Sequence, residues 1–209
     1  MSAGLAALVT ILLEAAPAAA HHVGAYTPRD NEISANFKQL KFSIQARKLD
    51  VALKLFETGA LRQAMRAQAS KLPPGLEEST RAALRAGDGP GAERGLVTFF
   101  AALARDLALE GDRQLADPRA TLEARAAAAR KFLEAIWRYY NLIDFAVTQR
   151  EPKAAATIRL AVDEAEAFVK PAAAPAAPNP DRVRGPLREI ARVLGDVIAA
   201  APMSTRRES

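Results

Sequence analysis

The sequence contains no cysteine and only two histidines, the adjacent His21 and His22. Without cysteine the chain forms no disulfide, zinc finger, iron–sulfur cluster or thiol nucleophile. Two neighbouring histidines near one end leave none for a Ser-His-Asp triad, a zincin helix or a carboxylate–histidine di-iron site inside the fold. We therefore predict that the protein is not an enzyme. Catalysis by carboxylates alone stays open, with Glu134 and Asp144 beside an aromatic cluster as the candidates.

A phosphate-binding loop is also missing from the sequence, because Gly87-Asp-Gly-Pro-Gly91 lacks the Lys-Ser/Thr pair of a P-loop. The chain carries 29 basic and 24 acidic residues, a net charge of +5. Most of the basic residues are interleaved with acidic ones along the predicted helices and do not form one stripe. This charge pattern argues against a nucleic-acid partner. Half of the 209 residues are hydrophobic and a quarter are charged, which is typical of one globular domain with appendages.

The amino-terminal stretch has the pattern of a cleaved leader. Residues 3–13 form an apolar run of the length of a signal-peptide core, and the small residues Ala18-Ala19-Ala20 follow it. Residues 1–20 are therefore predicted to be a signal peptide, with a soluble mature chain that begins at His21 and is periplasmic or secreted. No basic residue precedes the run and Glu14 ends it, so a helix packed in the core is the alternative.

Apolar residues at three- and four-residue spacing predict an all-α bundle of about five to seven amphipathic helices. Thr27-Pro28 and Asp117-Pro118 both read as an N-cap followed by an N1 proline. The expected helices cover about 28–45, 49–70, 76–86, 92–111, 118–150, 153–169 and 181–200. Residues 21–170 form the expected bundle domain, 171–180 a Pro/Ala linker, and 181–209 a separable amphipathic helix with a polar tail.

A faint repeat occurs at an offset of 103 residues, where Leu40-Lys-Phe-Ser-Ile44 aligns with Ile143-Asp-Phe-Ala-Val147. One interpretation is a bundle built from two related helical hairpins. The other is chance, since helical periodicity alone generates such matches. Near Phe42 the apolar residues alternate briefly as in a strand, although we count Phe42 with the apolar face of its helix.

The two histidines are the candidate metal ligands. If cleavage follows Ala20, the free amine and imidazole of His21 resemble the histidine brace of secreted copper proteins. If cleavage follows Ala18, the terminus resembles the amino-terminal copper- and nickel-binding motif, with His21 in third position. Such nitrogen ligands suit copper, and Tyr26, Asp30 or Glu32 are possible further ligands. The alternative is a pair of solvated histidines on an unordered terminus.

A structural or adaptor subunit that binds a protein partner is the second functional hypothesis. Trp137 and Tyr139 are candidates to border a groove between helices, although such residues are more often part of the core. Arginines gather in the C-terminal segment, at positions 182, 184, 188, 192, 206 and 207. This basic segment and its amphipathic helix would suit a partner groove, an acidic partner or a membrane surface.

Overall fold

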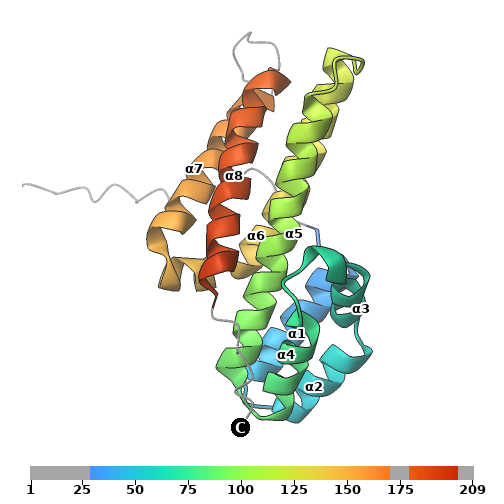
Figure 1. The fold of residues 1–209 in the computed structure, drawn as a ribbon, viewed down its shortest axis with the longest axis vertical. Helices are drawn as coiled ribbons and strands as arrows, with labels where there is room; N and C mark the ends of the chain where they lie inside the picture. Colours follow the sequence, from blue (N-terminus) through green and yellow to red (C-terminus); the bar gives the residue numbers. More distant parts are fainter. Residues whose placement is uncertain (1–28, 170–178, 202–209) are drawn as a thin grey trace, which may run out of the picture.

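The computed structural model describes residues 29–169 and 179–201, and within these ranges the chain is all-α with no strand. This confirms the predicted fold class. The elements, in order, are α1 (Glu32–Gln45), α2 (Leu49–Thr58), α3 (Ala60–Ala67), a short 3-10 turn (Ala69–Lys71), α4 (Leu76–Arg85), α5 (Gly89–Leu115), α6 (Leu122–Arg150), α7 (Pro152–Val169) and α8 (Pro180–Ala200). The long helix α5 runs through the molecule, with α1 to α4 around its first half and α6 to α8 alongside the rest (Figure 1).

Side-chain caps decide where two of the helices begin, and both expected starts were wrong. Residues 29–31 are not helical, and α1 begins at Glu32, because the Asn31 side chain accepts the Ser34 backbone N–H in a capping box. The predicted cap at Thr27 lies outside the described residues. Helix α6 begins after Thr121, whose hydroxyl accepts the backbone N–H of Ala124. Asp117 instead accepts the backbone N–H of Arg119 in the preceding turn.

A break at Gly59 divides the expected helix 49–70 into α2 and α3, so the described ranges contain eight α-helices. Gly59 has an extended backbone (φ −92°, ψ 168°). The buried Asn36 of α1 spans the break, since its amide donates to the Leu55 carbonyl (3.2 Å) and its oxygen accepts the Leu61 N–H (3.1 Å). Asn36 thus supplies two hydrogen bonds that the interrupted helical ladder lacks, and it fixes α1 against α2 and α3.

Helix α5 forms the centre of the core because small residues let its neighbours approach closely. A Cβ at Gly95 would overlap the Thr80 hydroxyl of α4, and one at Gly111 would lie 3.2 Å from both Phe132 of α6 and Leu187 of α8. Phe99 and Phe100 are fully buried. Of the helices in the described ranges, none combines the length and the hydrophobicity needed to cross a membrane.

Helix α8 is packed into this bundle, although the sequence favoured a separable helix. It packs against α5 and α7 and buries an apolar stripe of Val183, Leu187, Ile190, Ala191, Val193, Leu194 and Val197. Arg184 bonds Asp112 of α5 at 2.7 Å, and Arg192 bonds Glu189 and Asp196 on its own helix. The apolar face of α8 and two of its arginines are therefore already engaged within the chain.

Candidate functional site

The predicted metal ligands His21 and His22 lie outside the described residues, as does Tyr26. Within the described ranges, no three histidine, cysteine, aspartate or glutamate side chains gather to hold a metal ion. Asp30, suggested as a further ligand, bonds the amine of Lys38 and the hydroxyl of Ser34. The hydrogen bonds from Lys38 and Ser34 lower the pKa of the Asp30 carboxyl. Asp30 thus lies just before α1, where its hydrogen bonds to Ser34 and Lys38 connect it to the start of the helix.

The aromatic cluster on α6 belongs to the core. Trp137 is 6% exposed and Tyr140 is fully buried. Tyr139 is half-buried, and its hydroxyl accepts a 2.9 Å hydrogen bond from the Asn31 amide, which joins the start of α1 to the middle of α6. Tyr139 therefore helps to hold α1 and α6 in position, whereas the groove described below lies nearer to the end of α6.

The two candidate catalytic carboxylates are each bound to an arginine. Glu134 accepts from Arg138 one turn later on α6, at 3.1 Å. Asp144 accepts two hydrogen bonds from Arg159 of α7, at 3.0 and 2.6 Å, and so connects the two helices. Burial and the adjacent Asp144 carboxylate raise the pKa of the Tyr140 hydroxyl. Both acids are therefore engaged in structural ion pairs, and Tyr140 remains neutral.

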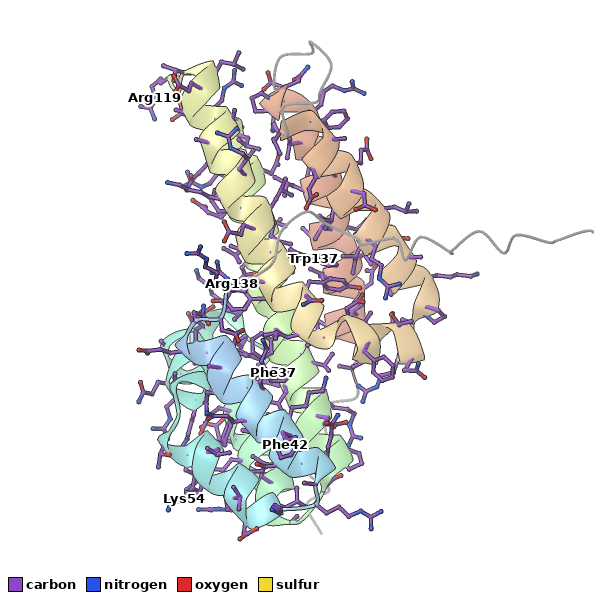
Figure 2. The ribbon with its side chains drawn as sticks, turned by 180° about the vertical axis from the view of Figure 1, so that it is seen from behind. Phe37, Phe42, Lys54, Arg119, Trp137 and Arg138 are labelled. Carbon is purple, nitrogen blue, oxygen red and sulfur yellow. The ribbon has the colours of Figure 1, made fainter. Side chains whose placement is uncertain are left out.

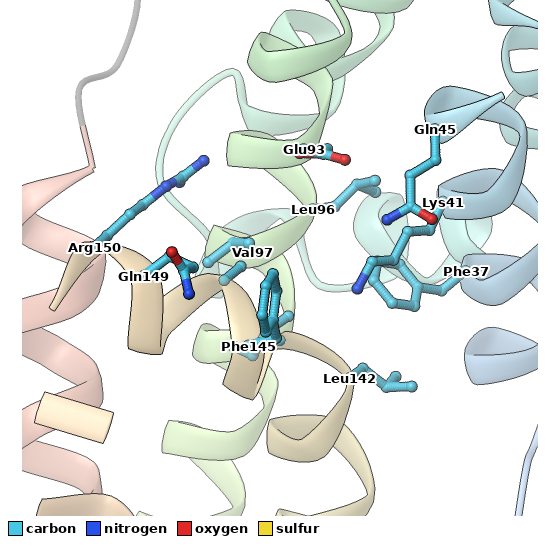
Figure 3. Close-up of a pocket in the computed structure, with 12 residues that line it drawn as sticks. Phe37, Lys41, Gln45, Glu93, Leu96, Val97, Leu142, Phe145, Gln149 and Arg150 are labelled. Carbon is cyan, nitrogen blue, oxygen red and sulfur yellow. The ribbon is translucent and has the colours of Figure 1, made fainter. Parts of the chain in front are cut away.

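An apolar groove lies between α1, α5 and α6, with a volume of about 190 Å³. Figure 3 shows α5 behind the groove, with side chains from α1 and α6 on either side of it. The lining residues are Phe37, Lys41 and Gln45 of α1, Glu93, Leu96 and Val97 of α5, and Leu142, Ile143, Phe145, Ala146, Gln149 and Arg150 of α6. The groove therefore combines an apolar floor with polar and charged side chains at its rim.

Two cations of this rim are free of ion pairs in the part of the chain that the structure describes. Lys41 lies over the Phe37 ring, 5.8 Å from its centroid. Arg150 ends α6, is exposed, and lies across the groove from Lys41 and Gln45 (Figure 3). Glu93 is the one carboxylate among the lining residues. The rim thus carries a net charge of +1, with both cations available to an outside group.

Two large aromatic side chains on the groove-forming helices α6 and α1 are exposed; Phe145 lines the groove, and Phe42 follows the lining residue Lys41 without lining the groove itself. Phe145 at its edge is 68% exposed, and Phe42 of α1 is 71% exposed (Figure 2). Phe42 was wrongly counted with the apolar face of its helix. It stands two residues, or about 200° around the helix, from both Leu40 and Ile44, which are buried.

The repeated sequence pattern predicts this exposure. Phe145 occupies the position that matches Phe42 in the faint repeat, and it likewise lies two residues from each of two buried residues, Ile143 and Val147. The brief strand-like alternation in each copy is the signal of an outward-facing phenylalanine on an otherwise amphipathic helix. Sequence reasoning noticed the alternation and did not draw this consequence.

The bundle architecture alone identifies no activity, because helical bundles support many unrelated functions. The conclusions about this site therefore depend on its own side chains. When compared with known proteins, the chain matches no family model, no curated protein and no solved structure.

Proposed function

We propose that this chain is a non-catalytic docking protein that binds a protein partner in the groove between α1, α5 and α6. The observation that carries the proposal is Phe145, which is left 68% exposed at the edge of an apolar groove. Phe42, which is 71% exposed, follows the lining residue Lys41 on the helix that forms the opposite wall. Clustered apolar exposure marks interaction sites more often than scattered exposure does. Aromatic side chains are also enriched among the residues that dominate the affinity of interfaces.

The size of the groove supports a protein partner over a small ligand. Its volume of about 190 Å³ is below the roughly 300–1,000 Å³ of typical small-molecule sites. A space of this size suits one or two side chains of a partner whose remaining surface would cover Phe42 and Phe145. Burying most of two phenylalanine side chains, about 120 Å² each, would contribute about 6 kcal/mol at roughly 25 cal/mol per Å² before the costs of association.

The chemistry of the lining supports a role in binding rather than catalysis. Glu93 is the only carboxylate among the lining residues, and none of them is a histidine. A general acid–base mechanism would need a second titratable group within hydrogen-bond reach of the same reacting atom. The amine of Lys41 is the other such group in the lining, and within the described residues no hydrogen bond or ion pair joins it to Glu93. Glu134 and Asp144, the acids that sequence reasoning singled out, are bound to arginines.

Co-purification from the native host tests the proposal. A tagged chain should retain a partner that Phe145→Asp loses, because an aspartate at the groove edge opposes burial of the partner's apolar surface. Leu160→Asp is the matched control, since Leu160 of α7 is 69% exposed and lies outside the groove lining. Both variants should unfold at the wild-type temperature. Equal partner recovery with wild type and Phe145→Asp would contradict the proposal.

An exported metal-handling role is a second proposal, and it rests on the sequence alone. The chain's two histidines, His21 and His22, follow the small residues that favour cleavage after Ala18 or Ala20. A copper ion held by the free amine and the imidazole of His21 would be lost as pH falls, because protons compete for both nitrogens.

Intact mass and copper titration of the natively processed protein test this second proposal. A terminus at His21 or Ala19, with one Cu(II) bound, supports it, and His21→Ala should then abolish binding. A terminus at Met1 in the exported protein would contradict both the signal peptide and the copper site.

A further inference from the structure

We infer that the partner segment occupying the groove is an amphipathic α-helix with acidic residues beside its apolar face. This inference rests on the proposed docking function and specifies the chemistry of its partner. It follows from three properties of the described residues: the helical spacing of the two groove walls, the unpaired cations of the rim, and the exposed phenylalanines.

The walls have the periodicity that receives another helix. On α1 the lining residues Phe37, Lys41 and Gln45 recur every four positions, and on α6 Leu142, Ala146 and Arg150 do the same, with further lining residues in the row beside them. Each wall thus presents a helical ridge about two turns long, or roughly 12 Å at 1.5 Å per residue. A partner helix would lie between the ridges with one or two apolar residues, at i and i+3 or i+4, inserted toward the α5 floor.

The positive charge of the rim favours a partner helix with acidic residues beside its apolar face. Lys41 and Arg150 have no ion-pair partner within the described ranges and are set against one carboxylate, Glu93. Acidic residues beside the apolar face of the partner would pair with these two cations. Charged rim groups of this kind select the partner and accelerate association more than they add affinity.

Other occupants fit these features less well. A second copy of this chain would bring two net-positive rims together, which opposes a symmetric interface. The chain's own terminal stretches offer little complementary charge, because Glu14 is the single acidic residue of positions 1–28 and the tail sets Arg206 and Arg207 against one Glu208. A nucleic-acid backbone would pair with the cations and leave the apolar floor uncovered.

A selection from displayed helical peptides tests the inference. The probe is a library of peptides of about sixteen residues, or roughly four helical turns, selected on the full chain and counter-selected on Phe145→Asp. Enriched peptides should carry glutamate or aspartate beside a three-four apolar repeat. The best peptide, labelled and titrated by fluorescence anisotropy, should bind the Lys41→Glu/Arg150→Glu double variant about tenfold more weakly, since two exposed ion pairs become repulsions.

Two controls isolate the charge effect. The Lys54→Glu/Arg130→Glu double variant makes the same change in net charge at exposed positions outside the groove lining, and it should bind like wild type. A peptide with its acidic residues exchanged for lysine should recover affinity for the Lys41→Glu/Arg150→Glu variant. Wild-type affinity should also fall as salt rises from about 50 mM to about 500 mM.

The outcomes separate the inference from the proposed function. One contrary result is a set of selected peptides that depend on Phe145 but are basic or uncharged, and another is a set that binds the Lys41→Glu/Arg150→Glu variant as well as wild type. Either result would contradict an acidic partner helix and would leave the proposed docking function in place. If no peptide distinguishes wild type from Phe145→Asp, the docking function itself fails. A homodimer that Phe145→Asp dissociates, detected by sedimentation, would place a second copy in the groove and overturn the inference.

Discussion

The Asn36 hydrogen bonds at the Gly59 break offer a test of how α1, which forms one wall of the groove, is held in place. In Asn36→Ala, the carbonyl of Leu55 and the N–H of Leu61 lose their side-chain partner. Each buried backbone group left without a partner costs about 1–3 kcal/mol. We expect the free energy of unfolding to fall by about 3 kcal/mol. This is less than the largest possible loss because water that enters the site can bond to part of the exposed backbone.

Gly59→Ala should cost a similar amount for the same reason. Its φ of −92° suits any residue, but a Cβ there would overlap the Asn36 amide and the Leu55 carbonyl. The Asn36 side chain must then leave, which breaks the same two hydrogen bonds. The double variant should therefore cost clearly less than the sum of about 6 kcal/mol, because both single variants break the same two hydrogen bonds, although the overlap of the Cβ with the Leu55 carbonyl remains.

Urea unfolding followed by far-ultraviolet circular dichroism measures all three variants. Gly195→Ala in α8 is the matched control, since a Cβ at Gly195 meets no atom of another element within 4 Å and no proline follows it. It should raise the free energy of unfolding by up to about 1 kcal/mol. Additive losses in the double variant, or a loss below about 0.5 kcal/mol for Asn36→Ala, would refute the role assigned to Asn36.

Further predictions concern α4, α8 and the effect of acid. Gly95→Ala should lower the unfolding temperature, because its Cβ overlaps the Thr80 hydroxyl, and Thr80→Ala should partly restore it; an unchanged temperature would contradict the close approach of α4 and α5. Gly195→Ala, inside α8 with no atom within 4 Å of its Cβ, should stabilise the chain in a thermal melt. The Arg81 hydrogen bond lowers the pKa of Glu57 from its usual 4.5, so this pair stabilises the fold above about pH 4.5 and ceases to do so as pH falls through the folded pKa. Arg81→Met should therefore reduce the acid dependence of unfolding in urea, and an unchanged dependence would contradict the pair.

The sequence predicted the fold class and many of the elements because those depend on local pattern. Pro152 begins α7 with only Glu151 between it and the end of α6, and α8 covers the predicted helix 181–200. The two wrong helix starts show the limit of that reasoning. A proline at N1 is only a preference, whereas Asn31 and Thr121 begin α1 and α6 because their side chains reach backbone N–H groups.

The candidate site depends on tertiary packing that the sequence pattern does not contain. The groove forms where α1, α5 and α6 meet, and Phe37 and Phe145 lie more than one hundred positions apart in the chain. The faint repeat placed Phe42 and Phe145 at matching positions, and the alternation of apolar residues around them was a signal of outward-facing side chains that the sequence reasoning did not use. The hydrogen-bond partners of Asn36 could not be predicted from the sequence either, because its side chain bonds the backbone of Leu55 and Leu61, which lie on two other helices.

Photo-crosslinking from the groove edge tests the docking claim most directly. A benzophenone amino acid at position 145, introduced in the native host, should crosslink one partner protein, and mass spectrometry should place the crosslinked residue in an acidic amphipathic helix. The same probe at position 160, an equally exposed site on α7, should give no such product. Equal crosslinking from both positions, or none from position 145, would contradict a partner in the groove.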